Sequence, residues 1–212
     1  MKTAWFVWAA AGGLGLIAAG CATYPDPAAT RQIAEKMVSE SYSAPMPALL
    51  KRLVQDRSQQ ICSKIGEAKL TQAEAAEVVE LARASIQYPK SGKLAGDWKI
   101  GDRLAHDGAG DRIQFGSLER RKENGGLCQN CHALAPGDIN VGNVGPSLTG
   151  YGSQRGNSEA VAKLTYERIY NGWAFAPCSN MPRLGANRHL TPEQVAHLVA
   201  YLIDPRSPVN TK

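Results

Sequence analysis

The sequence predicts an all-α fold, and three observations favour this class. Thr71, Ser158 and Thr191 are helix-capping residues, and each precedes a segment rich in helix-forming residues. Apolar residues in these segments recur every three or four positions, as they do on one face of a helix. No segment alternates apolar and polar residues over the length typical of a strand. Hydrophobic residues make up 43% of the 212-residue chain, as in an ordinary soluble globular protein.

Three helices are expected in the N-terminal half of the chain. The first covers residues 29–41. The second covers 47–64, where leucine, valine and isoleucine form an apolar stripe. The third begins at a T-x-x-E capping box, Thr71 with Glu74. Together these helices form a predicted extension over 21–95.

Glycine-rich loops and shorter helices follow, and they form a predicted second domain over 96–212. A helix is expected over 111–122. The next helix covers 159–170 and is capped by Ser158. The last begins at a T-x-x-Q capping box that starts at Thr191, with proline at the first helical position. Its apolar residues at i, i+3, i+4 and i+7 predict that one face is buried.

The first residues predict export from the cytoplasm. Lys2 is followed by an uncharged run over 5–19, the order found in a secretory signal peptide, so residues 1–20 are expected to be removed. The stretch A-A-G-C ends at Cys21 and is similar to the site where bacterial lipoproteins are cleaved and acylated. We therefore expect a periplasmic protein. Lipid on Cys21 would also anchor it to a membrane, whereas ordinary cleavage near Ala22 would leave it free.

The chain is moderately basic, with a formal net charge of +5 and a pI near 9.0. Its lysines and arginines are scattered along the sequence, so no nucleic acid partner is expected. A positive charge of this size suits an acidic partner protein or a membrane surface.

Cys128, Cys131 and His132 form the pattern C-x-x-C-H. Thiols at this spacing reach the two vinyl groups on one edge of a haem, and the histidine that follows then reaches the iron. A zinc site would need two further ligands at suitable spacing, and a redox dithiol would need a βαβ context. The sequence provides neither, so the motif predicts one covalently bound haem c.

The iron needs a second axial ligand, for which Cys178, Met181, His189 and His197 are the downstream candidates. Met181 lies in a polar loop between two prolines, a poor place for a core methionine, so it is the preferred ligand. Cys178 is the runner-up, because thiolate also binds haem iron. Methionine in the sixth position raises the reduction potential and leaves no open site for oxygen, which favours electron transfer.

The loop over 143–152 is expected to form the wall of the haem site on the His132 side. The carbonyl oxygen of Pro146 is placed to accept a hydrogen bond from His132 Nδ1 and so fix the imidazole. Leu148 is expected to pack on the haem. Arg183 is a further candidate for the haem edge, with ordinary packing as its alternative.

Cys62 and Cys178 remain as an even pair once the haem motif and Cys21 have been assigned. Disulfides form in exported proteins, so we hypothesise a bond between these two residues. That bond would close a long loop and restrain the segment that carries Met181. If both thiols were free, Cys178 would remain a possible ligand of the iron.

The order of these elements resembles class I cytochromes c. It comprises a helix, C-Q-N-C-H, G-P-S-L-T-G, a middle helix, N-M-P and a capped final helix. The resemblance implies a class I cytochrome c fold that follows an N-terminal helical extension. It also implies that the first and last helices of the haem domain cross, with Gly116 and Tyr201 near the contact.

Longer stretches resemble SoxX, the mono-haem subunit of the SoxAX thiosulfate-oxidising complex, in a long variety with an N-terminal extension. These stretches are YPKSGKLAGDWKIGDRLAHDG, CQNCHAL, GNVGPSLTGYG and MPRLGANRHLTPEQVAHLVAYL. Together they place the resemblance over residues 88–204, so it does not reach the first helices.

Resemblance to SoxX implies a function that depends on partners. A SoxA-type haem subunit pairs with SoxX, and the pair acts as L-cysteine S-thiosulfotransferase, which joins thiosulfate oxidatively to a cysteine of a SoxY-type carrier protein. SoxX takes the electrons and passes them to a small acceptor cytochrome c. The sulfur chemistry stays on the partner, so no catalytic residue is expected here. The alternative is a free or membrane-tethered class I cytochrome c that carries electrons to a terminal oxidase.

Overall fold

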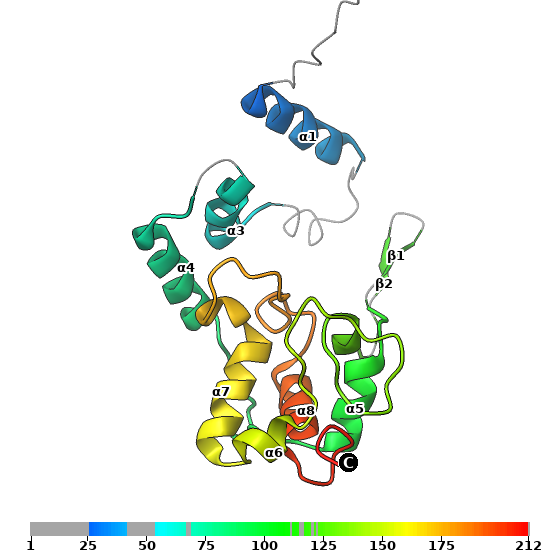
Figure 1. Ribbon diagram of the computed structural model, residues 1–212. Coiled ribbons are helices and arrows are strands. Elements are labelled where there is room, and N and C mark those ends of the chain that lie inside the picture. The colour runs from blue at the N-terminus through cyan, green and yellow to red at the C-terminus, as the bar shows by residue number, and fades with distance from the viewer. Residues whose placement is uncertain are drawn as a thin grey trace, which may run out of the picture. The chain divides into compact units, whose positions relative to one another are not determined.

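The computed structural model of this chain describes residues 26–41, 54–66, 69–110, 112–114, 117–119, 121 and 123–211. They belong to two compact units, Met1–Ser41 and Tyr42–Lys212, and each unit is described by itself (Figure 1). The predicted signal peptide over 1–20 and the predicted lipidation site Cys21 lie outside the described residues.

In the first unit, helix α1 (Pro27–Ser41) confirms the helix expected over 29–41. Proline at the first helical position has its φ angle already set for a helix and lacks an N–H that would otherwise be unpaired. The carbonyl oxygen of Asp26 accepts hydrogen bonds from the backbone N–H and the hydroxyl of Thr30, at 2.8 and 3.1 Å. Local signals therefore account for the start of this helix.

The first helix that the structure describes in the second unit is α3 (Arg57–Cys62). It lies within the helix predicted over 47–64 and starts where Asp56 forms a capping box with Gln59. Residues 47–53 of that prediction lie outside the described residues.

Helix α4 (Gln72–Ala84) follows α3 after a 3-10 turn, η1 (Ser63–Gly66). Its predicted capping box is present. The Thr71 hydroxyl accepts from the backbone N–H of Glu74 at 3.2 Å, and the Glu74 carboxylate accepts from the backbone N–H of Thr71 at 3.1 Å. Two unpaired donors at the helix start are thereby satisfied, which fixes the position of the helix end.

Helices α5 (Trp98–His106) and α8 (Pro192–Ile203) pack against each other at a glycine. A Cβ atom at Gly101 would lie 2.8 Å from the Cβ of Tyr201 and closer still to the α8 backbone. Only glycine permits this approach, so the expected helix crossing is present. The glycine at this contact is Gly101, and Gly116, the glycine expected near it, lies outside the described residues.

The helix predicted over 111–122 is wrong. Strands β1 (Arg112–Gln114) and β2 (Ser117–Glu119) form an antiparallel hairpin in which Ile113 is paired with Leu118. The first helix of the second domain is instead α5, which ends before this segment. Ile113 is β-branched, which favours a strand, and α5 is the helix that packs against α8.

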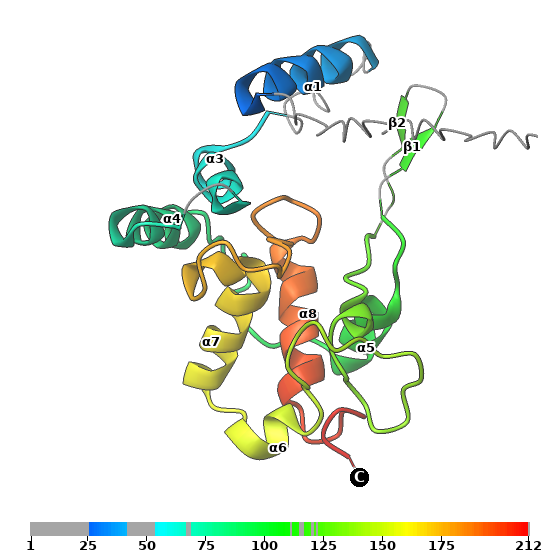
Figure 2. The same cartoon turned by 45° about the horizontal axis from the view of Figure 1, so that its top comes forward.

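The core surrounds α8, which lies between α5 and α7 (Glu159–Tyr170) in both views (Figures 1 and 2). Both α7 and α8 confirm their predicted starts, at Ser158 and Thr191. Because α8 has a neighbour on each side, it buries more than the single face expected from its pattern. Its buried residues are Val195, Ala196, Leu198, Val199, Ala200, Tyr201, Leu202 and Ile203.

A short helix, α6 (Tyr151–Arg155), connects the loop after the C-x-x-C-H motif to α7 and contacts α8. Among the helices that the structure describes, none combines the length and the apolar character needed to cross a membrane.

Candidate functional site

One tight turn brings Cys128, Cys131 and His132 together. The turn is a 3-10 helix, η2 (Cys128–Asn130). The backbone N–H groups of Cys131 and His132 both donate to the carbonyl oxygen of Cys128, at 3.1 and 2.9 Å. Neither cysteine is in a disulfide, and burial raises the pKa of the Cys128 thiol to about 11. The turn thus brings two cysteines that form no disulfide and an imidazole together at one place.

The imidazole of His132 is fixed by the loop that follows. Its Nδ1 donates a hydrogen bond to the carbonyl oxygen of Pro146 at 2.7 Å, as expected from the sequence. Because a carbonyl oxygen can only accept, Nδ1 carries the proton and Nε2 keeps its lone pair for a metal. A Cβ atom at Gly145 would lie 2.5 Å from His132 Nδ1 and 2.8 Å from Nε2, so glycine is required beside the ring.

An apolar cavity opens beside this imidazole, between the C-x-x-C-H turn and the helices of the core. Leu148 borders it, as expected for a residue that packs on a haem. Its lining residues are Ala105, Cys128, His132, Leu134, Leu148, Ile169, Met181, Leu184, Leu198, Tyr201 and Leu202. An apolar pocket with one thiol, one imidazole and one thioether fits a haem, which needs an apolar surface and sulfur or nitrogen ligands.

The loop that carries Met181 lies between η3 (Gly172–Ala174) and α8. Within it, the indole Nε1 of Trp173 donates to the carbonyl oxygen of Ser179 at 2.8 Å. The backbone N–H of Gly185 donates to the carbonyl oxygen of Tyr170 at 3.0 Å. The loop is therefore attached to its surroundings on both sides of Met181.

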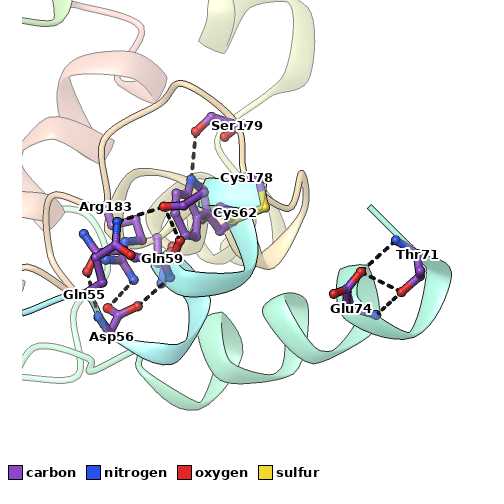
Figure 3. Close-up of a disulfide and its surroundings, with 12 residues drawn as sticks. Gln55, Asp56, Gln59, Cys62, Thr71, Glu74, Cys178, Ser179 and Arg183 are labelled. Carbon is purple, nitrogen blue, oxygen red and sulfur yellow. Dashed lines mark hydrogen bonds and ion pairs between the residues drawn. A yellow bond between two sulfur atoms is a disulfide. The ribbon is translucent and has the colours of Figure 1, made fainter. Parts of the chain in front are cut away.

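The predicted disulfide between Cys62 and Cys178 is present, and it joins α3 to the Met181 loop (Figure 3). The two cysteines are separated by 116 positions in sequence. The bond removes Cys178 from the set of candidate iron ligands. It also places a covalent attachment three residues before Met181.

The remaining candidate ligands are engaged elsewhere. His189 Nε2 donates to the carbonyl oxygen of Gly125 at 2.8 Å, and His197 Nδ1 accepts the backbone N–H of Asp97 at 2.8 Å. Neither histidine lines the cavity. Of the four downstream candidates, all within the part of the chain that the structure describes, Met181 alone borders the cavity with His132.

Arg183 does not line the cavity, contrary to its proposed place at the haem edge. Its guanidinium forms an ion pair with Asp56, with 2.8 Å between Nη1 and Oδ2, and lies 4.5 Å from the centre of the Trp173 ring. The Arg183 side chain is only 9% exposed. The counter-charge of Arg183 is thus Asp56, which belongs to the predicted extension. The local sequence around Arg183 does not reveal this partner.

A histidine between two carboxylates connects α5 with the loop after the C-x-x-C-H motif. His106 Nδ1 lies 2.8 Å from the carbonyl oxygen of Asp102, and Nε2 lies 3.3 Å from Asp138 Oδ2. Burial lowers the pKa of His106, but hydrogen bonds to Asp102 and Asp138 and their charges outweigh it, so the pKa is raised. The His106 ring is 6.0 Å from that of Tyr201, which lines the cavity.

From the sequence, a glycine of the loop over 143–152 is expected to let the backbone approach the ring, and in the structure Gly145 lies against the His132 imidazole, whereas Asp56 was missed. Gly145 stands directly before Pro146 in GNVGPSLTGYG, and a glycine in that tight stretch was the available signal. Asp56 carries a local signal, a D-x-x-Q capping box with Gln59, that predicts only where a helix starts. Its ion pair with Arg183 depends on tertiary structure.

Comparisons with known proteins agree with this geometry. The family model described as Cytochrome c matches residues 125–204, from the glycines before the C-x-x-C-H motif to the end of α8. A protein of Aquifex aeolicus (strain VF5), described as an uncharacterized lipoprotein, is 41% identical over 156 residues. That alignment covers 74% of this chain and 73% of the relative.

Proposed function

Because this chain belongs to the cytochrome c family and carries covalently bound haem c in an all-α class I fold, we propose that Cys128, Cys131 and His132 hold that haem. The cysteines supply the two thioether bonds, and His132 Nε2 supplies one axial ligand. Haem c provides a reversible one-electron couple, so the protein is an electron-transfer protein.

The observation that carries the proposed ligand set is the shared cavity of His132 and Met181. The Pro146 carbonyl orients the imidazole, and the other downstream candidates are bonded elsewhere. With Met181 as the second axial ligand, both axial positions are filled by protein atoms. Electron transfer needs no open position, whereas binding of oxygen or peroxide does.

The finer proposal is that this chain is the electron-transfer subunit of a SoxAX-type L-cysteine S-thiosulfotransferase. Its support is the resemblance over 88–204, above all the stretch Met181–Leu202. In that reaction a carrier thiol and thiosulfate form a sulfur–sulfur bond and release two electrons and a proton. A SoxA-type subunit performs the sulfur chemistry on a SoxY-type carrier, and this chain passes the electrons on, one at a time, to a small acceptor cytochrome c.

Export and lipid attachment belong to the same proposal. The relative from Aquifex aeolicus is described as a lipoprotein, and the stretch A-A-G-C ends at Cys21 in this chain. We propose that the mature protein lies in the periplasm and is tethered to a membrane by lipid on Cys21.

A reconstituted electron-transfer assay tests the proposed role. The full-length holo-protein is mixed with a SoxA-type subunit, a SoxY-type carrier and thiosulfate, and reduction is followed by visible absorbance. We expect reduction of this protein only in the complete mixture. Omitting this chain corrects for absorbance of the partner haem, and a carrier with serine in place of its cysteine is the second control.

Two outcomes would contradict the role in thiosulfate oxidation. One is failure of this chain to bind the SoxA-type subunit in size-exclusion chromatography. The other is the same reduction rate with the serine carrier. Rapid electron delivery to a terminal oxidase by the isolated protein would then favour the free or tethered carrier.

A further inference from the structure

Helix α3 is attached to the Met181 loop on both sides of the methionine. Cys62, the last residue of α3, forms the disulfide with Cys178, three positions before Met181. Asp56, the residue that caps the start of α3, pairs with Arg183, two positions after Met181. One helix therefore holds the short segment that contains the proposed ligand at both of its ends (Figure 3).

The attachment through Arg183 is a buried contact rather than an ordinary surface ion pair. The Arg183 side chain is 9% exposed, whereas that of Asp56 is 51% exposed. Loss of the Asp56 charge would leave the guanidinium without its counter-charge in a poorly solvated position. The Trp173 ring beneath the guanidinium is itself bonded to Ser179 of the same loop, so a shift of Arg183 would move the loop.

Helix α3 is itself fixed to the rest of the unit. The Arg57 guanidinium binds both carboxylate oxygens of Glu77 in α4, at 2.7 and 2.9 Å. Ile61 is fully buried. The segment after α4 then joins the core, where Asn171 donates to the Ser85 hydroxyl and Tyr166 donates to the Gln87 carbonyl oxygen. These contacts hold α3 in place relative to the core, so α3 can restrain the Met181 loop.

The loop needs such support, because its backbone is not held by a regular element. Cys178 has φ of 59°, in the left-handed region that residues other than glycine rarely adopt. Such a conformation persists where the surroundings impose it. The disulfide at Cys178 itself supplies one of those constraints.

We propose that α3 positions the Met181 sulfur, with Asp56 and the Cys62–Cys178 disulfide as its two contacts. This device, which we name the α3 clamp, slows release of the methionine from the iron. The inference rests on the proposed axial role of Met181 and is independent of the role in thiosulfate oxidation. Asp56 and Cys62 act as positioning residues, because neither borders the cavity.

The test is the rate at which imidazole replaces the native ligand in the ferric holo-protein. At saturating imidazole the observed rate equals the rate at which the native ligand leaves. Asp56→Asn removes the charge but keeps a residue that caps helices equally well, so α3 is retained. Cys62→Ser combined with Cys178→Ser removes the disulfide. We expect each change to raise the limiting rate by about tenfold.

Arg57→Gln is the matched control. It removes an ion pair that joins the same helix to Glu77 of α4 instead of to the Met181 loop. Because the Arg57 and Glu77 side chains are 54% and 40% exposed, their ion pair adds little to the attachment of α3, which buried Ile61 maintains. We therefore expect the limiting rate of Arg57→Gln to equal that of the wild type. Far-UV circular dichroism and the global unfolding rate, measured on the same samples, separate ligand release from unfolding.

Three other outcomes would contradict the inference. If the wild type shows the long-wavelength band of sulfur–iron bonding and neither variant changes the limiting rate, the α3 clamp is refuted while Met181 remains the ligand. An equal increase in Arg57→Gln would refute it as well, because loss of any α3 contact would then suffice. If imidazole binds the wild type without a limiting rate, Met181 is not a ligand, and the inference fails together with that part of the proposed function.

Discussion

Gly145 lies against the imidazole ring of His132, so close that a Cβ atom at this position would be 2.5 Å from Nδ1. The next carbonyl along the chain, that of Pro146, accepts the Nδ1 proton at 2.7 Å. Gly145 therefore leaves room for the His132 ring, and the Pro146 carbonyl oxygen fixes its orientation. Together they orient the proposed iron ligand. This relationship makes the geometry of the His132 side of the site testable by single substitutions.

Gly145→Ala is expected to displace the His132 ring, because the added methyl group overlaps it. Loss of support of this kind around a metal ligand lowers occupancy or activity by about tenfold or more. The measurement is covalently bound haem per chain, by mass spectrometry and visible absorbance. Gly137→Ala is the control, since a Cβ there has no neighbour within 4 Å. Equal haem content and equal spectra in the two variants would contradict the prediction.

Removal of the disulfide is expected to lower the free energy of unfolding. Cys62 and Cys178 enclose 116 positions of sequence, and the chain-entropy model for a loop of this length gives about 4–5 kcal/mol. The loss in free energy of unfolding is measured by denaturant titration. The Cys62→Ser, Cys178→Ser double variant is compared with the oxidised wild type. A loss below about 1 kcal/mol would show that the unfolded chain gains little freedom when the bond is absent.

His106 predicts a stability difference that depends on pH. Its pKa in the folded protein is raised above the ordinary value of 6.5 by Asp102 and Asp138, despite the opposing effect of burial. A raised pKa contributes stability that is fully present below the unfolded pKa and is lost as pH rises through the folded pKa. The free energy of unfolding of the wild type should therefore exceed that of His106→Gln by the largest amount below pH 6.5.

Denaturant titrations of wild type and His106→Gln at about pH 5.5 and about pH 8.5 measure this difference. The advantage of the wild type should shrink at the higher pH. An advantage that grows with pH would mean that the neutral imidazole is the form preferred by the fold.

Gly101→Ala is expected to force α5 and α8 apart. The new Cβ would lie 2.8 Å from the Cβ of Tyr201 and would overlap the α8 backbone, which cannot move aside as a flexible side chain can. Overpacking of this kind costs about 1–3 kcal/mol or more. Thermal unfolding measures the loss, and Gly137→Ala again serves as the control. If Gly101→Ala unfolded at the same temperature as the wild type, the two helices would be able to separate without loss of stability, contrary to the prediction.

Local signals in the sequence were enough for much of the fold and of the site. Thr71, Ser158 and Thr191 each cap the helix that they predict, because a capping bond depends only on residues three positions apart. The C-x-x-C-H spacing identifies the haem motif, since its chemistry is also local. Counting cysteines gave the pair Cys62 and Cys178, since only two remained unassigned.

Features that depend on tertiary contacts were not accessible from sequence in the same way. The segment over 111–122 has a helical composition, yet a hairpin forms there because α5 already occupies the position against α8. Arg183 was a candidate for the haem edge with ordinary packing as its alternative, and it packs instead against Asp56 from the extension. The first outcome depends on packing against α8 and the second on Asp56, and each partner is distant in sequence from the segment concerned, so a local pattern does not encode it.

Met181 as the second axial ligand is the central claim, and the ferric absorption spectrum tests it most directly. The weak long-wavelength band of sulfur–iron bonding should be present in the wild-type protein and absent in Met181→Ala. With Cys178 held in the disulfide, no other downstream candidate offers a sulfur atom. Absence of the band in the wild type, or its persistence in Met181→Ala, would contradict the claim.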